Sequence, residues 1–223
     1  MHLTTKRRRC RGDGGAVLIE AIVVLPLLLM FVFGIAEFGF TYHDNITLTT
    51  TTRSGARVSS NLAEHRRADF ETLKSIVAAI GSSSIGLDHI EGVLIFNANG
   101  TTSTETVPAN CFDAFGDARS SSVAGAECNF YDTSQMIDIA AMTPAQIIVR
   151  FGEEDHDFTD GCGVTAWDKD FCPVNRSRTP NPQTEYVGVW VQIKHDYTTG
   201  LLPWDSVTLE DSTVMGIEPI GAL

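Results

Sequence analysis

The stretch RRRCRGDGGAVLIE, residues 7–20, precedes an uncharged apolar run over residues 21–36, and together they decide the architecture. A basic head before such a run is typical of a single membrane helix whose N-terminus stays in the cytoplasm. Residues 21–36 span about 24 Å as a helix, whereas a hydrocarbon core of roughly 30 Å needs about 20 residues. The helix reaches that length only by including residues 17–19, which places Glu20 in or against the apolar layer.

Glu20 is the anomaly of this segment. A carboxylate at that depth costs about 2.5 to 3.5 kcal/mol on insertion scales, so an intramembrane acid indicates a function and needs a cationic partner. The basic cluster ends at Arg11, too far along the chain to be that partner. A cut after Gly15 would place a new ammonium on Ala16, one helical turn from Glu20, where the two could pair within or between chains. We therefore expect processing between Gly15 and Ala16 and an assembly role for Glu20.

This arrangement resembles a prepilin processing site, in which a membrane peptidase cuts after a glycine and the mature chain carries glutamate as its fifth residue. Three segments extend the likeness: EAIVVLPLLL at 20–29, GIAEFG at 34–39 and RSGAR at 53–57. In this order they resemble the N-terminal signature of TadE-like minor pseudopilins of the Tad (Flp) pilus assembly system. The resemblance implies a structural subunit, not an enzyme, whose partners are a prepilin peptidase and other pilins and pseudopilins.

Two simpler interpretations of the N-terminal region remain open. One is a plain signal anchor with an incidental Glu20, since a basic head before an apolar run is common to all such anchors. The other is a secreted chain cut near Gly34-Ile35-Ala36, although the apolar region before that site exceeds the usual 7 to 15 residues.

The charge distribution suits a domain outside the membrane. The net charge is −12, but residues 1–15 carry five basic groups and one acid, which leaves −16 on the remainder. Such an acidic exterior argues against nucleic acid and anionic lipids as partners. We expect a single-pass protein of a bacterial cytoplasmic membrane, which contacts the membrane through residues 16–42. Its N-terminus should be cytoplasmic and its C-terminal domain extracytoplasmic. Incorporation in a surface pilus is a further prospect.

The five cysteines divide into Cys10, on the cytoplasmic side, and four beyond the membrane segment. An even number in an oxidising compartment predicts disulfides, and no pair has the C-x-x-C spacing of a zinc or redox site. Four cysteines allow three pairings. We favour Cys111 with Cys128 and Cys162 with Cys172, because both loops are short and too polar to fold on apolar burial alone.

The sequence predicts an α+β protein in four parts: a basic leader over 1–15, a transmembrane helix over 16–42, a helical continuation or linker over 43–61, and an extracytoplasmic domain over 62–223. Glu37, Tyr42 and His43 should mark the outer membrane interface, where they can reach headgroups and water. The threonines of 47–52 are poor helix formers. The TadE-like resemblance nevertheless implies a helix through Arg57.

In the C-terminal domain, apolar residues at helical spacing over 62–80 predict an amphipathic helix packed on a small antiparallel sheet, with Gly81 as its C-terminal cap. Runs rich in β-branched and aromatic residues predict strands over 92–96, 146–151 and 186–193, with further strand-like runs at 207–210 and 212–219. Residues 101–125 should form an irregular excursion held by its cysteines.

No catalytic or cofactor motif is present in the sequence: there is no G-x-S-x-G, H-E-x-x-H or phosphate-binding glycine loop. The acidic segment 153–161 is the best metal candidate, but it lacks EF-hand spacing, and a solvated loop is the preferred interpretation. We therefore predict no metal and no cofactor. The leading function is a minor pseudopilin that starts, caps or tunes a Tad-type pilus. An uncleaved anchored ectodomain that binds an envelope or surface partner is the alternative, and an extracytoplasmic enzyme is third.

Overall fold

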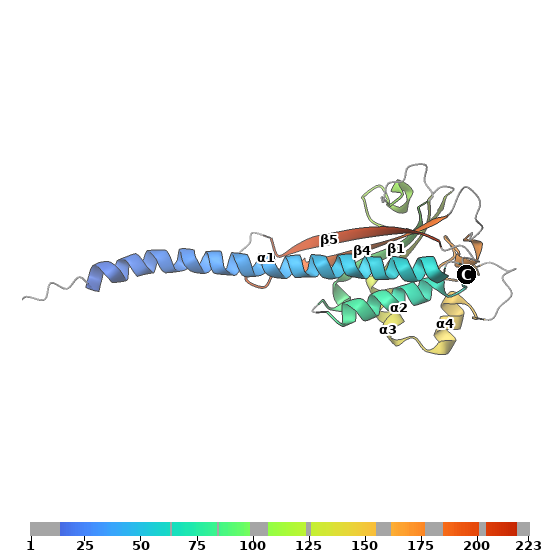
Figure 1. Cartoon of the computed structure of the whole chain (residues 1–223), viewed down its shortest axis with the longest axis horizontal. Coiled ribbons are helices and arrows are strands. Elements are labelled where there is room, and N and C mark those ends of the chain that lie inside the picture. Colours follow the sequence, from blue (N-terminus) through green and yellow to red (C-terminus); the bar gives the residue numbers. More distant parts are fainter. Residues whose placement is uncertain are drawn as a thin grey trace, which may run out of the picture.

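A long helix that projects from a compact α+β domain dominates the computed structural model (Figure 1). The structure describes residues 14–62, 64–83, 85–98, 107–123, 126–154, 162–176, 185–200 and 204–217, and of residues 14–17 the backbone alone. Helix α1, Gly14–Leu62, contains 49 residues. Its N-terminal part projects from the domain and its C-terminal part is packed inside the domain, so one helix serves both parts of the molecule.

The threonine-rich part of α1 is helical without interruption, as the resemblance implied and as propensity alone did not. Several threonine hydroxyls donate to the carbonyl four residues back, as Thr47 does to His43 at 3.1 Å and Thr52 does to Leu48 at 3.1 Å. Thr51 and Thr52 are also buried against the domain. Tertiary burial therefore overrides the weak local preference of these residues.

A five-stranded antiparallel sheet forms the centre of the domain, with the order β2-β3-β1-β4-β5. The strands are β1 Ile90–Asn97, β2 Ser121–Val123, β3 Ala126–Asp132, β4 Tyr186–Asp196 and β5 Ser206–Gly216. The predicted antiparallel sheet and its strands at 92–96 and 186–193 are confirmed. The run at 207–210 and the part of the second run up to Gly216 form one strand, β5, which pairs with β4 from Tyr186 opposite Gly216 to Asp196 opposite Ser206. Residues 218 and 219 of the second run lie outside the described part.

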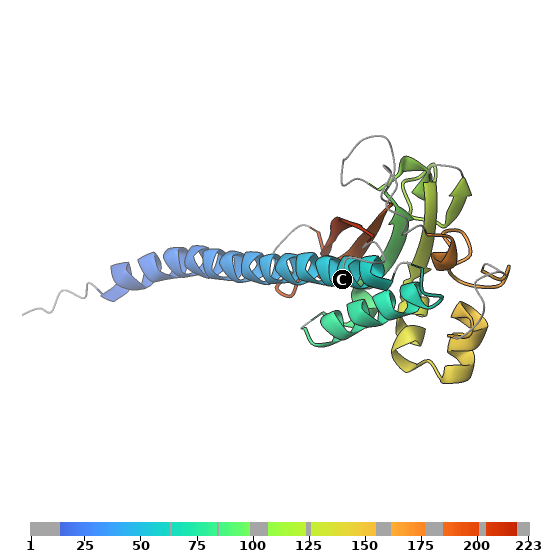
Figure 2. The ribbon, with the colours of Figure 1, turned by 45° about the vertical axis from the view of Figure 1, so that its right-hand side comes forward.

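Helices α1 and α2, Ala68–Gly81, lie next to each other on one side of the sheet (Figures 1 and 2). At Gly55 of α1 an added Cβ would lie 3.0 Å from Ile76 Cγ1 and 3.5 Å from Val189 Cγ1. The absence of a side chain at Gly55 thus lets α1 pass closely between α2 and β4. The main core includes these fully or almost fully buried side chains: Leu48, Ala56, Phe70, Leu73, Ile76, Ile80, Val93, Ile95, Tyr131, Val187, Val189 and Val191.

Residues 146–151 are not a strand, contrary to the prediction. They belong to helix α4, Pro144–Phe151, which follows helix α3, Thr133–Ala141. Gln146 accepts a hydrogen bond from the Thr143 backbone N–H at 2.9 Å, proline occupies the first turn, and Gly152 ends the helix at φ +85°. Of this helix only Phe151 is buried. Its capping therefore outweighs the strand preference of the β-branched run Ile147-Ile148-Val149.

A second, smaller core lies around residues 107–130, where the sequence predicted an irregular excursion. It contains the short strand β2 and the 3-10 turn Ala109–Cys111, and residues 99–106 lie outside the described part. Leu94, Phe96 and Trp190 from the sheet pack here with Cys111 and Cys128. Disulfides join Cys111 to Cys128 and Cys162 to Cys172, which is the pairing favoured from the sequence.

Candidate functional site

The N-terminal part of α1 presents an apolar surface that the domain does not cover. Within the described residues, α1 is the one helix long and apolar enough to cross a membrane, with no burial in its apolar window. Large side chains along it are 43% to 81% exposed: Leu18, Ile19, Ile22, Val23, Val24, Leu25, Leu27, Leu28, Leu29, Met30, Phe31, Val32, Phe33, Ile35, Phe38 and Phe40. Exposed apolar area on this scale requires a nonaqueous environment. The helix therefore suggests a membrane anchor.

Glu20 lies on this surface as an exposed acid. The Gly15–Ala16 peptide bond lies in the first turn of α1, and Ala16 and Glu20 are four residues apart in a continuous helix. That spacing puts their positions on one helix face, one turn apart. The geometry is compatible with the expected ammonium and carboxylate pair, while the cut itself stays a prediction.

The middle of α1 is joined to the β4–β5 hairpin by polar contacts. The Thr199 N–H donates to Glu37 Oε1 at 2.6 Å, and His195 Nδ1 lies 2.6 Å from Asp44 Oδ2. About two turns beyond Asp44, the Thr52 hydroxyl donates to Asp211 on β5. These contacts fix the orientation of the hairpin along α1.

Glu37 does not reach outward to headgroups and water as expected, because its side chain is 2% exposed and bonded to the hairpin. Tyr42, 66% exposed, and the side chain of His43, 62% exposed, do face outward. Sequence reasoning missed the hairpin contact because Glu37 and Thr199 are 162 residues apart.

The segment RSGAR at 53–57 has two distinct faces. Gly55 and Ala56 are buried, and they provide the close approach to α2 and β4. Arg53 and Arg57 are exposed. The small residues of this segment therefore have a packing role, and the arginines are available at the surface.

A buried cluster of charges joins α2, β3 and the Cys162–Cys172 loop. Arg66 Nη1 lies 2.7 Å from Asp168 Oδ2, and Arg176 Nη2 lies 2.7 Å from Asp69 Oδ1. On β3, Tyr131 and Asn129 donate to Asp69 Oδ2 at 2.9 and 2.7 Å, and Asn129 also donates to the Phe171 carbonyl at 2.9 Å. A loop with few apolar residues is thus anchored to the sheet by ion pairs and hydrogen bonds.

Burial governs the titration of this cluster. It raises the pKa of Asp168 to about 7, and the negative charge of Asp69 adds to the effect while Arg66 opposes it. Burial and Asp69 also raise the pKa of the Tyr131 hydroxyl well above its usual value, so the phenol stays protonated and donates to Asp69. This cluster lies against the disulfide loop, and its role is to hold the fold.

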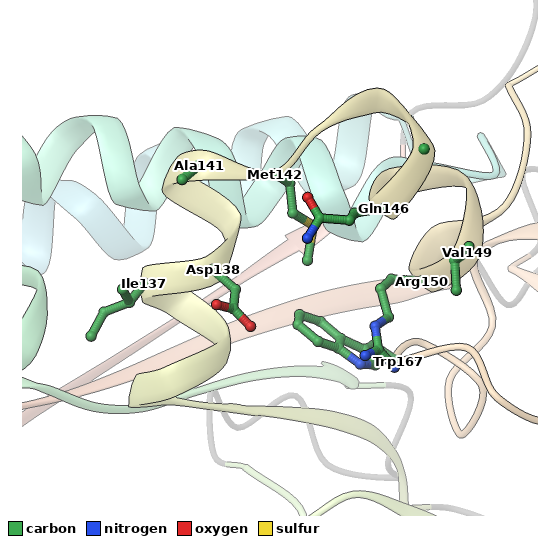
Figure 3. A pocket seen from close by; sticks show the side chains of 9 residues that line it. Ile137, Asp138, Ala141, Met142, Gln146, Val149, Arg150 and Trp167 are labelled. Atoms are coloured by element: carbon green, nitrogen blue, oxygen red, sulfur yellow. The ribbon is translucent and has the colours of Figure 1, made fainter.

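A groove lies between α3 and α4, with a cavity volume of about 460 Å³. Figure 3 shows Asp138 of α3 facing Arg150 of α4 and Trp167 across this space. The Arg150 guanidinium lies 5.1 Å from the centre of the Trp167 ring. Met142 and Val149 add apolar side chains to the lining, which suits packing or weak binding. The lining residues include no nucleophile paired with a base.

Of the acidic segment 153–161, residues 155–161 lie outside the described part of the chain. Within the described part of this segment, Glu154 pairs with Arg67 at 3.1 Å. Among the described residues no group of three or more His, Cys, Asp or Glu side chains is placed to hold a metal ion.

An exposed apolar helix whose second half completes the core of an α+β domain suggests a protein that is held at a membrane by this helix. Residues 15–57 match the model of the family described as TadE-like protein, which is consistent with a TadE-like protein of the Tad pilus system. The match begins at the glycine of the expected processing site and ends at Arg57, within α1. No curated protein and no solved structure matches the chain.

Proposed function

We propose that this protein is a minor pseudopilin, cut between Gly15 and Ala16, that acts in the assembly of a Tad-type pilus. The observation that carries the proposal is the exposed apolar half of α1, which bears Glu20 and lies within the TadE-like match. Subunits of this shape pack their apolar helices side by side. A carboxylate in that layer then sets the register by pairing with the terminal ammonium of the same or a neighbouring chain.

The topology follows from the same features. Basic residues 6–11 stay in the cytoplasm, α1 crosses the cytoplasmic membrane once, and the domain with its two disulfides lies in the oxidising space outside. The partners are a prepilin peptidase and other pilins and pseudopilins, and the role is structural, without catalysis.

The first test is mass spectrometry of the protein extracted from membranes. We expect Ala16 at the mature N-terminus, since the glycine before it and the acid four residues after it form the processing pattern. An intact Met1, or a terminus at Glu37, would contradict the processing and favour the uncleaved binding module or the cleaved secretory signal respectively.

The second test replaces Glu20 with Gln, which keeps the shape of the side chain and removes its charge. The ammonium would then lie unpaired in a poorly hydrated layer, at a cost of about 3 kcal/mol or more. We expect unchanged cleavage and domain stability, with sharply reduced pilus numbers and co-purification of pilins. Glu210→Gln, at an exposed position on β5, is the matched control and should assemble normally. Normal assembly of Glu20→Gln would reduce Glu20 to an incidental residue.

A further inference from the structure

The β4–β5 hairpin extends from the domain along α1 toward its exposed half (Figures 1 and 2). The strands end where Asp196 pairs with Ser206, and the Tyr197 N–H donates to the Asp205 carbonyl at 2.9 Å. Beyond this point the Thr199 N–H donates to Glu37 of α1 at 2.6 Å. The end of the hairpin is therefore held at a defined height on the anchor helix.

That height coincides with the edge of the membrane. Residues 17–36 form about 30 Å of helix, which matches the hydrocarbon thickness of a typical bilayer. Glu37 is the next residue, and the end of the hairpin is bonded to it. If α1 spans the membrane, the end of the hairpin lies where hydrocarbon gives way to headgroups. This step rests on the membrane placement of α1 and is independent of the pilus role.

The side chains at this end suit that environment. Tyr197 and residues of α1 that include Met30, Phe31, Gly34 and Phe38 line an apolar groove with a cavity volume of about 510 Å³. Trp204, on the other arm of the hairpin end, is 56% exposed. Tyr and Trp are the residues enriched at membrane interfaces, because an apolar ring and a polar group can each find a matching environment there.

Glu37 supports the same placement. Its side chain is almost fully buried and borders the groove, yet Oε2 has no hydrogen-bond partner among the described residues. An unpaired carboxylate oxygen is costly in hydrocarbon. Glu37 is therefore better placed at the edge of the apolar layer than within it.

We propose that the described end of the β4–β5 hairpin, residues 197–200 and 204–205, is a lipid-contact surface. Tyr197 and Trp204 then lie at headgroup depth, and a phospholipid chain of the leaflet facing the domain lies in the groove. The groove is continuous with the exposed apolar side chains of α1, which already require lipid. Lipid is therefore the occupant that the surrounding surface supplies. The hairpin then sets the tilt and height of the domain over the membrane.

The test uses the full chain in phosphatidylcholine vesicles whose acyl chains are brominated near the headgroup, since bromine quenches tryptophan on contact. The wild-type protein should lose a component of its emission that the Trp204→Phe variant does not lose. Trp167 and Trp190 lie within the domain and supply an unquenched background in both proteins. In a Trp204→Phe background, Tyr197→Trp should be quenched as well, because residue 197 lines the groove.

Ile22→Trp in the same Trp204→Phe background is the control for the span itself, because Ile22 is 62% exposed on α1 and does not line the groove. Equal quenching of the wild type and Trp204→Phe, with Ile22→Trp quenched, would overturn the hairpin proposal and leave the anchor intact. An unquenched Ile22→Trp would overturn both. If quenching of Trp204 by the brominated lipid instead falls as the protein concentration rises, a second copy of the chain occupies the groove in place of lipid, and the lipid proposal is overturned.

Discussion

The two halves of α1 reverse the usual relation between sequence and burial. Phe38 is 81% exposed, whereas Leu48, ten residues later, is fully buried, and beyond it the buried positions include Thr51, Thr52, Ser59 and Ser60. The strongly apolar half, residues 18–40, lies outside the domain and is called the exposed half. The threonine-rich half, whose buried positions run from Leu48 to Ser60, lies inside the core and is called the packed half. A long apolar run that no domain covers suggests a lipid environment. Small and hydroxyl side chains allow a helix to approach its neighbours closely inside a protein.

The largest effect should come from a bulky residue at the tightest point of the packed half. Gly55→Leu would force a side chain against Ile76 and Val189, where even a Cβ meets Ile76 at 3.0 Å. We expect a loss of at least about 3 kcal/mol, enough to unfold a marginal domain. Urea unfolding of the purified full chain, followed by tryptophan fluorescence, measures it.

Gly39→Leu is the matched change in the exposed half, where nothing lies within 4 Å of an added Cβ. It should leave the free energy of unfolding of the domain unchanged. A similar loss in both variants would show that the two halves do not differ in packing as described.

A smaller effect should distinguish the acids of the two halves. Asp44→Ala removes the partner of His195 at the junction and should cost about 1 to 2 kcal/mol of domain stability. Glu20→Ala, on the exposed surface, should cost the domain nothing while it impairs assembly. Thermal unfolding in the same detergent compares the two directly. Equal midpoints for Asp44→Ala and the wild type would show that the hairpin contact contributes no stability.

The last prediction concerns how the free energy of unfolding changes with pH through the buried charges beside the packed half. The native state keeps the proton of Asp168 up to about pH 7, whereas the unfolded chain loses it near 3.8. Between these values the native state binds more protons, so the free energy of unfolding falls as pH rises, by at most about 1.4 kcal/mol per pH unit.

Asp168→Asn should flatten this slope, because the side chain no longer titrates beside Asp69, Arg66 and Arg176. Urea unfolding at several pH values between 4 and 7 gives the slope for both proteins. An identical slope in the variant would assign the pH dependence to other groups.

Local patterns predicted the parts of the fold that each depend on one stretch of chain. The long apolar helix, the amphipathic helix and the strands β1 and β4 follow from hydrophobic periodicity and residue type. The bounds of the amphipathic helix were wrong: α2 begins at Ala68, because Leu62 still belongs to α1, and Ser82 takes the C-cap position predicted for Gly81. The same reasoning failed at α4, where Ile147-Ile148-Val149 reads as a strand by composition. A local signal was available there, since Thr143 and Gln146 have the spacing of a capping box, and Asp132 and Gln135 have the same spacing before α3.

By itself the sequence determined that the chain carries a basic head, a membrane-length apolar run with an acid at its start, and a TadE-like segment, because these features depend on order and spacing alone. Only the tertiary structure decided which half of α1 is buried, that Glu37 holds the end of the β4–β5 hairpin, and that Asp69 and Asp168 share one buried cluster with Arg66 and Arg176. Those contacts join residues about 100 or more positions apart, and they form because the sheet brings distant segments together around α1 and α2.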